Sequence, residues 1–163
     1  MKTLLITLAL SAAALMATPK TAVAQADASA IKAVIERETT AFNNRDAGTF
    51  ADCWANVPEA GQLVIWQEKD GKNTIISNRN TKQDMPVSGK ALMSSLGKPT
   101  GETFQNSDYQ IRTNGNAAFA QYEQVNNKPD GEKEYAHSTR YLEKIAGTWK
   151  IVHVGAVFYV PSK

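Results

Sequence analysis

Residues 135–160 read YAHSTRYLEKIAGTWKIVHVGAVFYV, and this stretch decides the fold class of the chain. β-Branched and aromatic residues dominate its two halves, Tyr135–Lys144 and Trp149–Val160, as they do in β-strands. Between the two halves, Ala146-Gly147 is a turn signal. The pattern predicts that the chain closes on a long antiparallel hairpin.

Two more hairpins are predicted upstream. Asn114-Gly115 is a strong turn signal between Asp108–Thr113 and Ala117–Val125, which both favour strands. A shorter pair, Leu63–Gln67 and Asn73–Ser77, flanks an Asp-Gly turn. We therefore expect three antiparallel hairpins in all.

Three helices are predicted from hydrophobic spacing. Apolar residues recur at helical intervals over Ala28–Asn43. Asp46 can accept hydrogen bonds from the first free amides of a second helix that contains Phe50–Trp54. A short third helix is expected over Ser88–Leu96, where Gly and Pro residues follow its end.

The order of these elements is helix, helix, hairpin, helix, hairpin, hairpin, which predicts an α+β domain with helices on one face of a curved antiparallel sheet. The chain resembles the nuclear transport factor two-like superfamily, in its SnoaL-like branch. The resemblance lies in Ile31–Phe42, Asn44-Arg45-Asp46, Phe50–Trp54 and Gly147–His153, and it extends over residues 27–160. It implies a cone, in which a strongly bent sheet wraps around the helices and leaves an apolar pocket at the open end.

The N-terminus has the features of an export signal. Met1-Lys2 is positively charged, Thr3–Ala17 is an apolar run, and Ala22-Val23-Ala24 is a cleavage site of small residues. The run is shorter than the ~20 residues that a membrane-spanning helix needs. We expect residues 1–24 to be a secretory signal peptide cleaved near Ala24, and residues 25–163 to be a secreted or periplasmic domain.

The formal charge of +2 belongs to this leader. The full chain has 18 basic and 16 acidic residues, and Lys2 and Lys20 lie within the leader, so the mature domain has no net charge. A neutral domain gives no argument for a nucleic-acid partner or, once the signal is removed, for a membrane partner, and we expect neither. The single cysteine, Cys53, cannot form an internal disulfide, and we expect it to be a small buried apolar residue.

No motif for a metal or a cofactor is present in the sequence. The two histidines, His137 and His153, are 16 positions apart, and no cysteine pair accompanies them. The glycines form no Gly-x-Gly-x-x-Gly array, and no serine has the flanking glycines of a nucleophile elbow. We expect neither a metal nor a cofactor.

Strand alternation indicates which side chains could line the pocket. If the last strand alternates strictly and Lys150 is in solvent, the inward face carries Trp149, Ile151, His153, Gly155 and Val157. The two faces of the preceding strand stay open, with His137, Thr139 and Tyr141 on one and Ser138, Arg140 and Leu142 on the other. Arg140 is expected to form an exposed pair with Glu143. Before them, Ala118, Ala120 and Tyr122 would face the interior.

The aromatic and imidazole side chains are the candidate ligand-binding residues. They are Trp54, Trp66, Tyr122, His137, Tyr141 and His153. Histidine can take up and release a proton near neutral pH, and a tyrosine hydroxyl can donate to a developing oxyanion. His153 and Tyr141 are therefore the candidate catalytic pair, with Tyr122 as an alternative donor. The competing interpretation is that the tryptophans pack the core and the histidines are surface or rim residues.

Two functions follow from these expectations. The first is a non-catalytic domain that binds a small apolar or aromatic molecule and forms a homodimer through its open sheet face. The second is a cofactor-free lyase or isomerase of the polyketide-cyclase type, with His153 as the base. Because the pattern places no Asp or Glu on the inward faces of the closing strands, we favour the binding domain.

Overall fold

The computed structural model describes residues 19–67, 72–79 and 90–159. Within them the chain forms three helices and six strands. In chain order these are α1 (Pro19–Asn44), α2 (Ala47–Cys53), β1 (Gly61–Gln67), β2 (Asn73–Arg79), α3 (Lys90–Ser95), β3 (Thr103–Asn114), β4 (Ala117–Asn127), β5 (Lys133–Ile145) and β6 (Thr148–Tyr159). The predicted order is confirmed. Most of the predicted signal peptide and the predicted Asp70-Gly71 turn lie outside the described residues.

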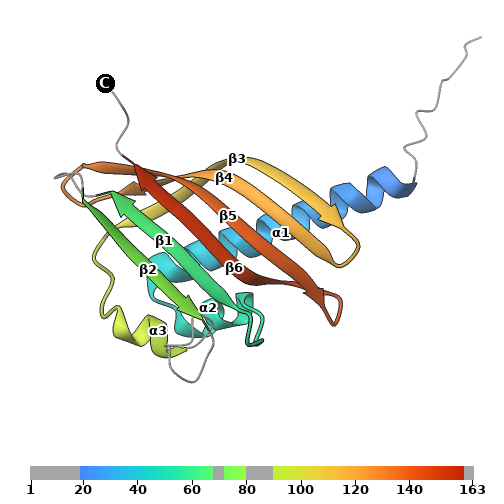
Figure 1. Ribbon diagram of the computed structural model, residues 1–163, viewed down its shortest axis with the longest axis horizontal. Coiled ribbons are helices and arrows are strands. Elements are labelled where there is room, and N and C mark those ends of the chain that lie inside the picture. The colour runs from blue at the N-terminus through green and yellow to red at the C-terminus, as the bar shows by residue number, and fades with distance from the viewer. Residues whose placement is uncertain (1–18, 68–71, 80–89, 160–163) are drawn as a thin grey trace, which may run out of the picture.

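The six strands form one curved sheet in the order β2-β1-β6-β5-β4-β3 (Figure 1). All neighbouring strands are antiparallel except β1 and β6, which run parallel. The predicted curved antiparallel sheet with helices packed on it is therefore confirmed, with this one parallel pair as the exception. The connection through α3 carries the chain from β2 to the opposite edge, so no hairpin sets the direction of β6 relative to β1.

The helices lie on one face of the sheet, because α1 buries its apolar stripe there (Figure 1). Ile31 and Ile35, one turn apart, are fully buried. Asp46 caps α2, because its carboxylate accepts from the backbone amides of Gly48 and Thr49 at 3.1 and 3.0 Å. The second predicted helix therefore begins where its capping residue indicates.

A polar anchor ties α1 to the hairpin of β5 and β6. The Trp149 indole donates to Asp27 at 3.1 Å, and Lys144 forms an ion pair with the same carboxylate. The hydrogen bond from Lys144, followed by that from Trp149, holds the pKa of Asp27 below its ordinary value. Leu142 and Ile151 are fully buried in the core beside this anchor.

The second predicted helix is one residue shorter than expected. It ends at Cys53, and Trp54 is extended and forms a parallel bridge with Ile151. Cys53 is buried, as expected, and burial raises the pKa of its thiol to about 11. The thiol therefore stays protonated and packs as a small apolar group.

A β-bulge in β6 overturns the strict alternation that the sequence suggested. Tyr141 pairs with His153, whereas the next residue, Leu142, pairs with Ile151, so Val152 is an extra residue in β6. Such an extra residue shifts every following side chain to the opposite face. His153 is consequently exposed instead of facing the interior.

The residues after the bulge follow the shifted pattern. Val154 and Ala156 are buried, although alternation from Trp149 placed them outside. Val157 is 48% exposed, although the same alternation placed it inside. Trp149 itself is buried as predicted.

β3 contains a second bulge, and its irregular residue has a left-handed backbone. The register shifts between Ser107 and Gln110, and φ of Asp108 is 54°. The strand also begins earlier than predicted, at Thr103. The shift turns Tyr109 toward the inner face, where it stacks on Tyr122 with 4.9 Å between ring centroids.

Candidate functional site

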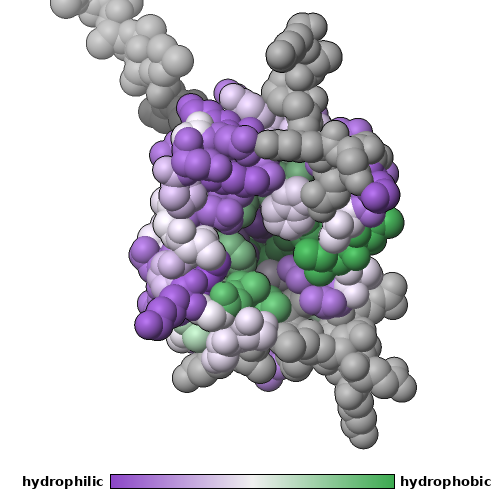
Figure 2. Space-filling view, turned by 90° about the vertical axis from the view of Figure 1, so that its left-hand side faces the viewer, coloured by the Kyte–Doolittle hydropathy of each residue, from purple (hydrophilic) through white to green (hydrophobic). Residues whose placement is uncertain are grey.

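A cavity of about 300 Å³ lies between the helices and the inner face of the sheet. On the helical side its walls are Glu38, Thr39 and Phe42 of α1, Phe50 of α2 and Leu92 of α3. Figure 2 views the molecule from the left-hand side of Figure 1 and shows hydrophobic side chains gathered around a hollow. The cavity is therefore largely apolar and open to solvent at this end.

Three successive rows of residues on the sheet side give the cavity two different ends. The strand register aligns Asn78, Gln62 and Val154 in one row, Ile76, Val64 and Ala156 in the next, and Trp66 and Phe158 in the last. In the last row the two rings stack with 4.0 Å between centroids and 6° between planes. One end of the cavity is thus polar and the opposite end is aromatic.

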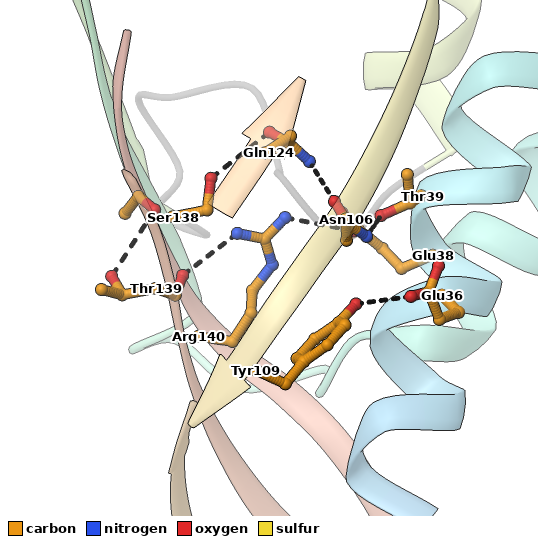
Figure 3. Close-up of polar contacts among 10 residues, drawn as sticks. Glu36, Glu38, Thr39, Asn106, Tyr109, Gln124, Ser138, Thr139 and Arg140 are labelled. Atoms are coloured by element: carbon orange, nitrogen blue, oxygen red, sulfur yellow. Dashed lines mark hydrogen bonds and ion pairs between the residues drawn. The ribbon is translucent and has the colours of Figure 1, made fainter. Parts of the chain in front are cut away.

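A buried ion pair lies at the polar end. Arg140 stands opposite Val154 in the register and is 5% exposed, as is Glu38. Its Nη2 lies 3.3 Å from Oε2 of Glu38, and its Nη1 donates to the carbonyl oxygen of Thr139 at 3.0 Å (Figure 3). Arg140 was expected to be exposed and paired with Glu143. That expectation is wrong, because Arg140 shares the inner face of β5 with Leu142.

The electrostatic surroundings keep Arg140 charged. Burial disfavours the charged guanidinium, but Tyr122 and Glu38 beside it raise the pKa of Arg140 above its ordinary value. The guanidinium also lies over the Tyr122 ring, with Cζ 5.4 Å from the centroid. A permanent positive charge therefore stands next to a carboxylate at the wall of an apolar cavity.

A polar chain of four side chains runs beside the ion pair, from α1 across β3 and β4 to β5 (Figure 3). Asn106 donates to Thr39 Oγ1 at 2.9 Å, Gln124 donates to Asn106 Oδ1 at 2.8 Å, and Ser138 donates to Gln124 Oε1 at 3.3 Å. Each member has a partner within this chain. These groups therefore stabilise the wall, and they use much of their hydrogen-bonding capacity in bonds to one another.

Two tyrosines pack behind the ion pair. The Tyr109 hydroxyl donates to Glu36 Oε1 at 2.8 Å (Figure 3). Burial, and for Tyr109 also this hydrogen bond, raises the pKa of both Tyr109 and Tyr122. Both rings are therefore neutral phenols at physiological pH.

The similarity of this chain to known proteins lies in its three-dimensional structure. A scan against protein-family models finds no match, and a search of the curated proteins finds none either. An NTF2-like protein with a cystatin-like fold from Novosphingobium aromaticivorans is 15% identical with a TM-score of 0.62, over 90% of this chain and 94% of that one. An NTF2-like protein of unknown function from Pseudomonas putida is 17% identical with a TM-score of 0.62, over 85% and 89%.

The chain has the NTF2-like fold. LinA is similar at the same level, with 14% identity and a TM-score of 0.62 over 86% of this chain and 90% of that one. These identities are low, so the likeness shows the fold and carries no activity across. The fold that the resemblance of the helices and the closing hairpin implied is confirmed.

Within the NTF2-like fold, one of the six predicted ligand-binding residues lines the cavity. That residue is Trp66. Trp54 is buried in the core, where its ring packs 5.9 Å from that of Phe50, and Tyr122 lies behind Arg140. Both are buried, as the sequence indicated, but neither of them lines the cavity.

The other three predicted residues lie on the outer face of the NTF2-like sheet. His137 is exposed and bonds to Glu123, with 2.7 Å between Nδ1 and Oε1. Tyr141 is 38% exposed and donates to Glu143 at 3.0 Å, and His153 is exposed beside it. No imidazole lines the cavity among the described residues, so the predicted arrangement of His153 and Tyr141 inside it is wrong.

Sequence reasoning missed the two charged residues of the cavity. Glu38 lies three residues after Ile35 and four before Phe42, which places it on the buried stripe of α1. A charged residue in an apolar stripe is the signal that could have found it. Arg140 was harder to place, because the face of its strand was left open.

The indole of Trp66 separates the cavity from a second, polar hollow of about 310 Å³ near Glu102 and Lys128. Its Nε1 donates to Oε2 of Glu134 at 3.3 Å. Burial would raise the pKa of Glu134, but hydrogen bonds from Lys128, Asn126 and Trp66 lower it below the ordinary value. Glu134 therefore stays ionised and holds the indole in place.

The described segments contain neither a cluster of metal ligands nor a helix that could span a membrane. No group of three His, Cys, Asp or Glu residues in residues 19–67, 72–79 and 90–159 is arranged to hold a metal ion. No helix in the same segments has a stretch long and apolar enough to cross a membrane.

Proposed function

We propose that this protein binds a small, mainly apolar molecule in the cavity and does not transform it. The cavity of about 300 Å³ supports the proposal, because its size is at the lower end of ligand pockets and its walls are mostly apolar. Its volume equals that of roughly ten liquid water molecules. A molecule with one or two rings fits this volume.

The ion pair favours binding over catalysis. Among the described lining residues, the one carboxylate is Glu38, and it is neutralised by Arg140 at 3.3 Å. That carboxylate is engaged in a buried ion pair, and the described lining residues bring no second carboxylate and no imidazole to the wall. The outward position of His153 removes the base on which the lyase or isomerase alternative depended.

The binding proposal is tested by filling the cavity. Ala156 lines the cavity and is 6% exposed, so Ala156→Leu puts a larger side chain into the space that a ligand would occupy. We expect ¹⁵N–¹H NMR titration with 2-naphthamide to show binding to the wild type at cavity residues. The leucine variant should bind at least about tenfold more weakly, a loss of ~1.4 kcal/mol.

The matched control is Val157→Leu, which enlarges the next side chain on the exposed face. This variant should bind the probe like the wild type. Equal binding by Ala156→Leu contradicts the proposed function, and so does a wild type that binds none of 2-naphthamide, 2-naphthoate and 2-methylnaphthalene.

We also propose that residues 1–24 are removed on export. The side chains of Val23–Ala26 are exposed, and the first ion pair of the described helix is made by Asp27. Cleavage after Ala24 would therefore leave the core contacts intact. When the full chain is produced in a bacterium, mass spectrometry of the periplasmic protein should find Gln25 at its N-terminus. Recovery from the cytoplasm with Met1 or Lys2 first would contradict this.

We further propose that the outer sheet face pairs with a second copy of the chain. Leu63, Phe119 and Val157 are 42%, 47% and 48% exposed on three strands of the face that lacks helices. An apolar sheet face of this kind can bury itself against its own copy around a two-fold axis. Sedimentation equilibrium should give twice the chain mass, and Phe119→Glu with Val157→Glu should give the single-chain mass. A monomeric wild type contradicts the pairing.

A further inference from the structure

We propose that the cavity selects a ring-bearing molecule with one uncharged polar group that both donates and accepts hydrogen bonds, such as a carboxamide, and that Glu38 and Arg140 bind this group. The inference rests on the proposed binding function and specifies its ligand class. It is carried by the polarity of the cavity, the bonding capacity of the ion pair and the charge at the polar end.

The polarity of the cavity fixes the orientation of the ligand. Trp66 and Phe158 form a stacked wall at one end, whereas Gln62 lies near Arg140 at the other. Arg140 and Glu38 are each 5% exposed, so the charged groups at the polar end lie inside the protein. A ligand would therefore bind with its polar group inward and its rings against the aromatic wall.

The bonding capacity of the wall points to the ion pair as the recognition element. The polar chain (Thr39, Asn106, Gln124 and Ser138) bonds within itself. A guanidinium has five N–H donors, and Arg140 uses one from each Nη in hydrogen bonds to described residues, which leaves a second N–H on each Nη. The Glu38 carboxylate, which can accept several bonds, receives one from Arg140 in the same residues. Spare donors and spare acceptors thus lie side by side.

The charge at this end selects an uncharged group. Glu38 and Arg140 cancel, and the neighbouring Gln62 and Asn78 are neutral amides. A ligand carboxylate would lie beside Glu38, and a ligand ammonium would lie beside Arg140, so either would meet a buried like charge. A carboxamide meets neither, because it accepts from Arg140 through its oxygen and donates to Glu38 through its nitrogen.

Three probes that share one ring system test the selection. They are 2-naphthamide, 2-naphthoate and 2-methylnaphthalene, each titrated into the ¹⁵N-labelled mature protein. We expect the amide to bind at least about tenfold more tightly than either of the other two. The methyl compound should still bind, because the aromatic wall is common to all three probes.

Glu38→Gln should reverse the preference. Removing the carboxylate leaves the positive charge of Arg140 without its partner, and a bound carboxylate can replace it. The naphthoate should then bind at least about tenfold more tightly than the amide. The matched control is Glu36→Gln, because Glu36 lies on the same helix but bonds to Tyr109 outside the cavity wall. The control should keep the order of the wild type.

A second variant covers the case in which Glu38→Gln does not fold. Glu38→Leu combined with Arg140→Met removes both charges together, and an apolar replacement of a buried pair is often tolerated. This double variant should bind the amide no better than the methyl compound. Equal affinities of the wild type for all three probes, or a wild-type preference for the naphthoate, would overturn the inference while leaving the binding function intact. Failure of all three probes to bind the wild type would overturn the binding function itself.

Discussion

Arg140→Met alone should lower the free energy of unfolding by about 3–5 kcal/mol, which is the cost of leaving a buried charge without its partner. Glu38 is 5% exposed, and its described partner is the guanidinium 3.3 Å away. Methionine matches much of the length of the arginine side chain. The decrease in the free energy of unfolding therefore measures the effect of the lost charge more than that of the lost volume. Urea denaturation followed by far-ultraviolet circular dichroism measures the change.

The double variant Glu38→Leu with Arg140→Met separates the ion pair from the packing. With neither charge buried, its stability should lie within about 1.5 kcal/mol of the wild type. The coupling energy of the pair is the change in the free energy of unfolding of the double variant minus the summed changes of Glu38→Leu alone and Arg140→Met alone. If Arg140→Met alone unfolds at the same urea concentration as the wild type, the pair is not the buried contact described above.

Trp149→Ala should cost about 3–5 kcal/mol of stability, because it empties a large volume in the core. Trp149 is 3% exposed and packs in the same cluster as Leu142 and Ile151. It also holds α1 against the hairpin of β5 and β6, since its indole donates to Asp27 at 3.1 Å. Removing the ring therefore loses a core anchor and loosens the contact between α1 and the hairpin of β5 and β6.

Trp149→Phe is the control for this second prediction. Phenylalanine keeps most of the buried ring but loses the hydrogen bond to Asp27. The loss of this bond should lower the free energy of unfolding by about 1 kcal/mol, in addition to the effect of the smaller ring. Both variants are compared by thermal and urea denaturation. If Trp149→Ala melts at the same temperature as the wild type, Trp149 is not an anchor of the core.

The secondary structure was predictable where local signals agree with the fold. Asp46 marks the start of α2, and Asn114-Gly115 marks the turn between β3 and β4. The inner face of β6 was not predictable, because the bulge at Val152 depends on how β5 pairs with it. One extra residue was enough to move His153 outside and Ala156 inside.

The candidate site was predictable in outline and not in its chemistry. The resemblance to the NTF2-like superfamily implied a cavity, and Trp66 was correctly placed among its aromatic walls. The sequence pattern pointed to histidines of the last strands, whereas the charged pair comes from α1 and β5. Glu38 and Arg140 are 102 positions apart, so no local pattern joins them; the fold brings them together.

The position of Trp66 makes it an intrinsic optical reporter. Trp54 and Trp149 are sealed in the core, and Trp66 is the one of the three tryptophans that lines the cavity. A guest against the stacked Trp66–Phe158 wall would change the emission of this indole and leave the other two almost unaffected. The unlabelled protein would then signal occupancy through its own fluorescence, with Trp66→Phe as the silent reference.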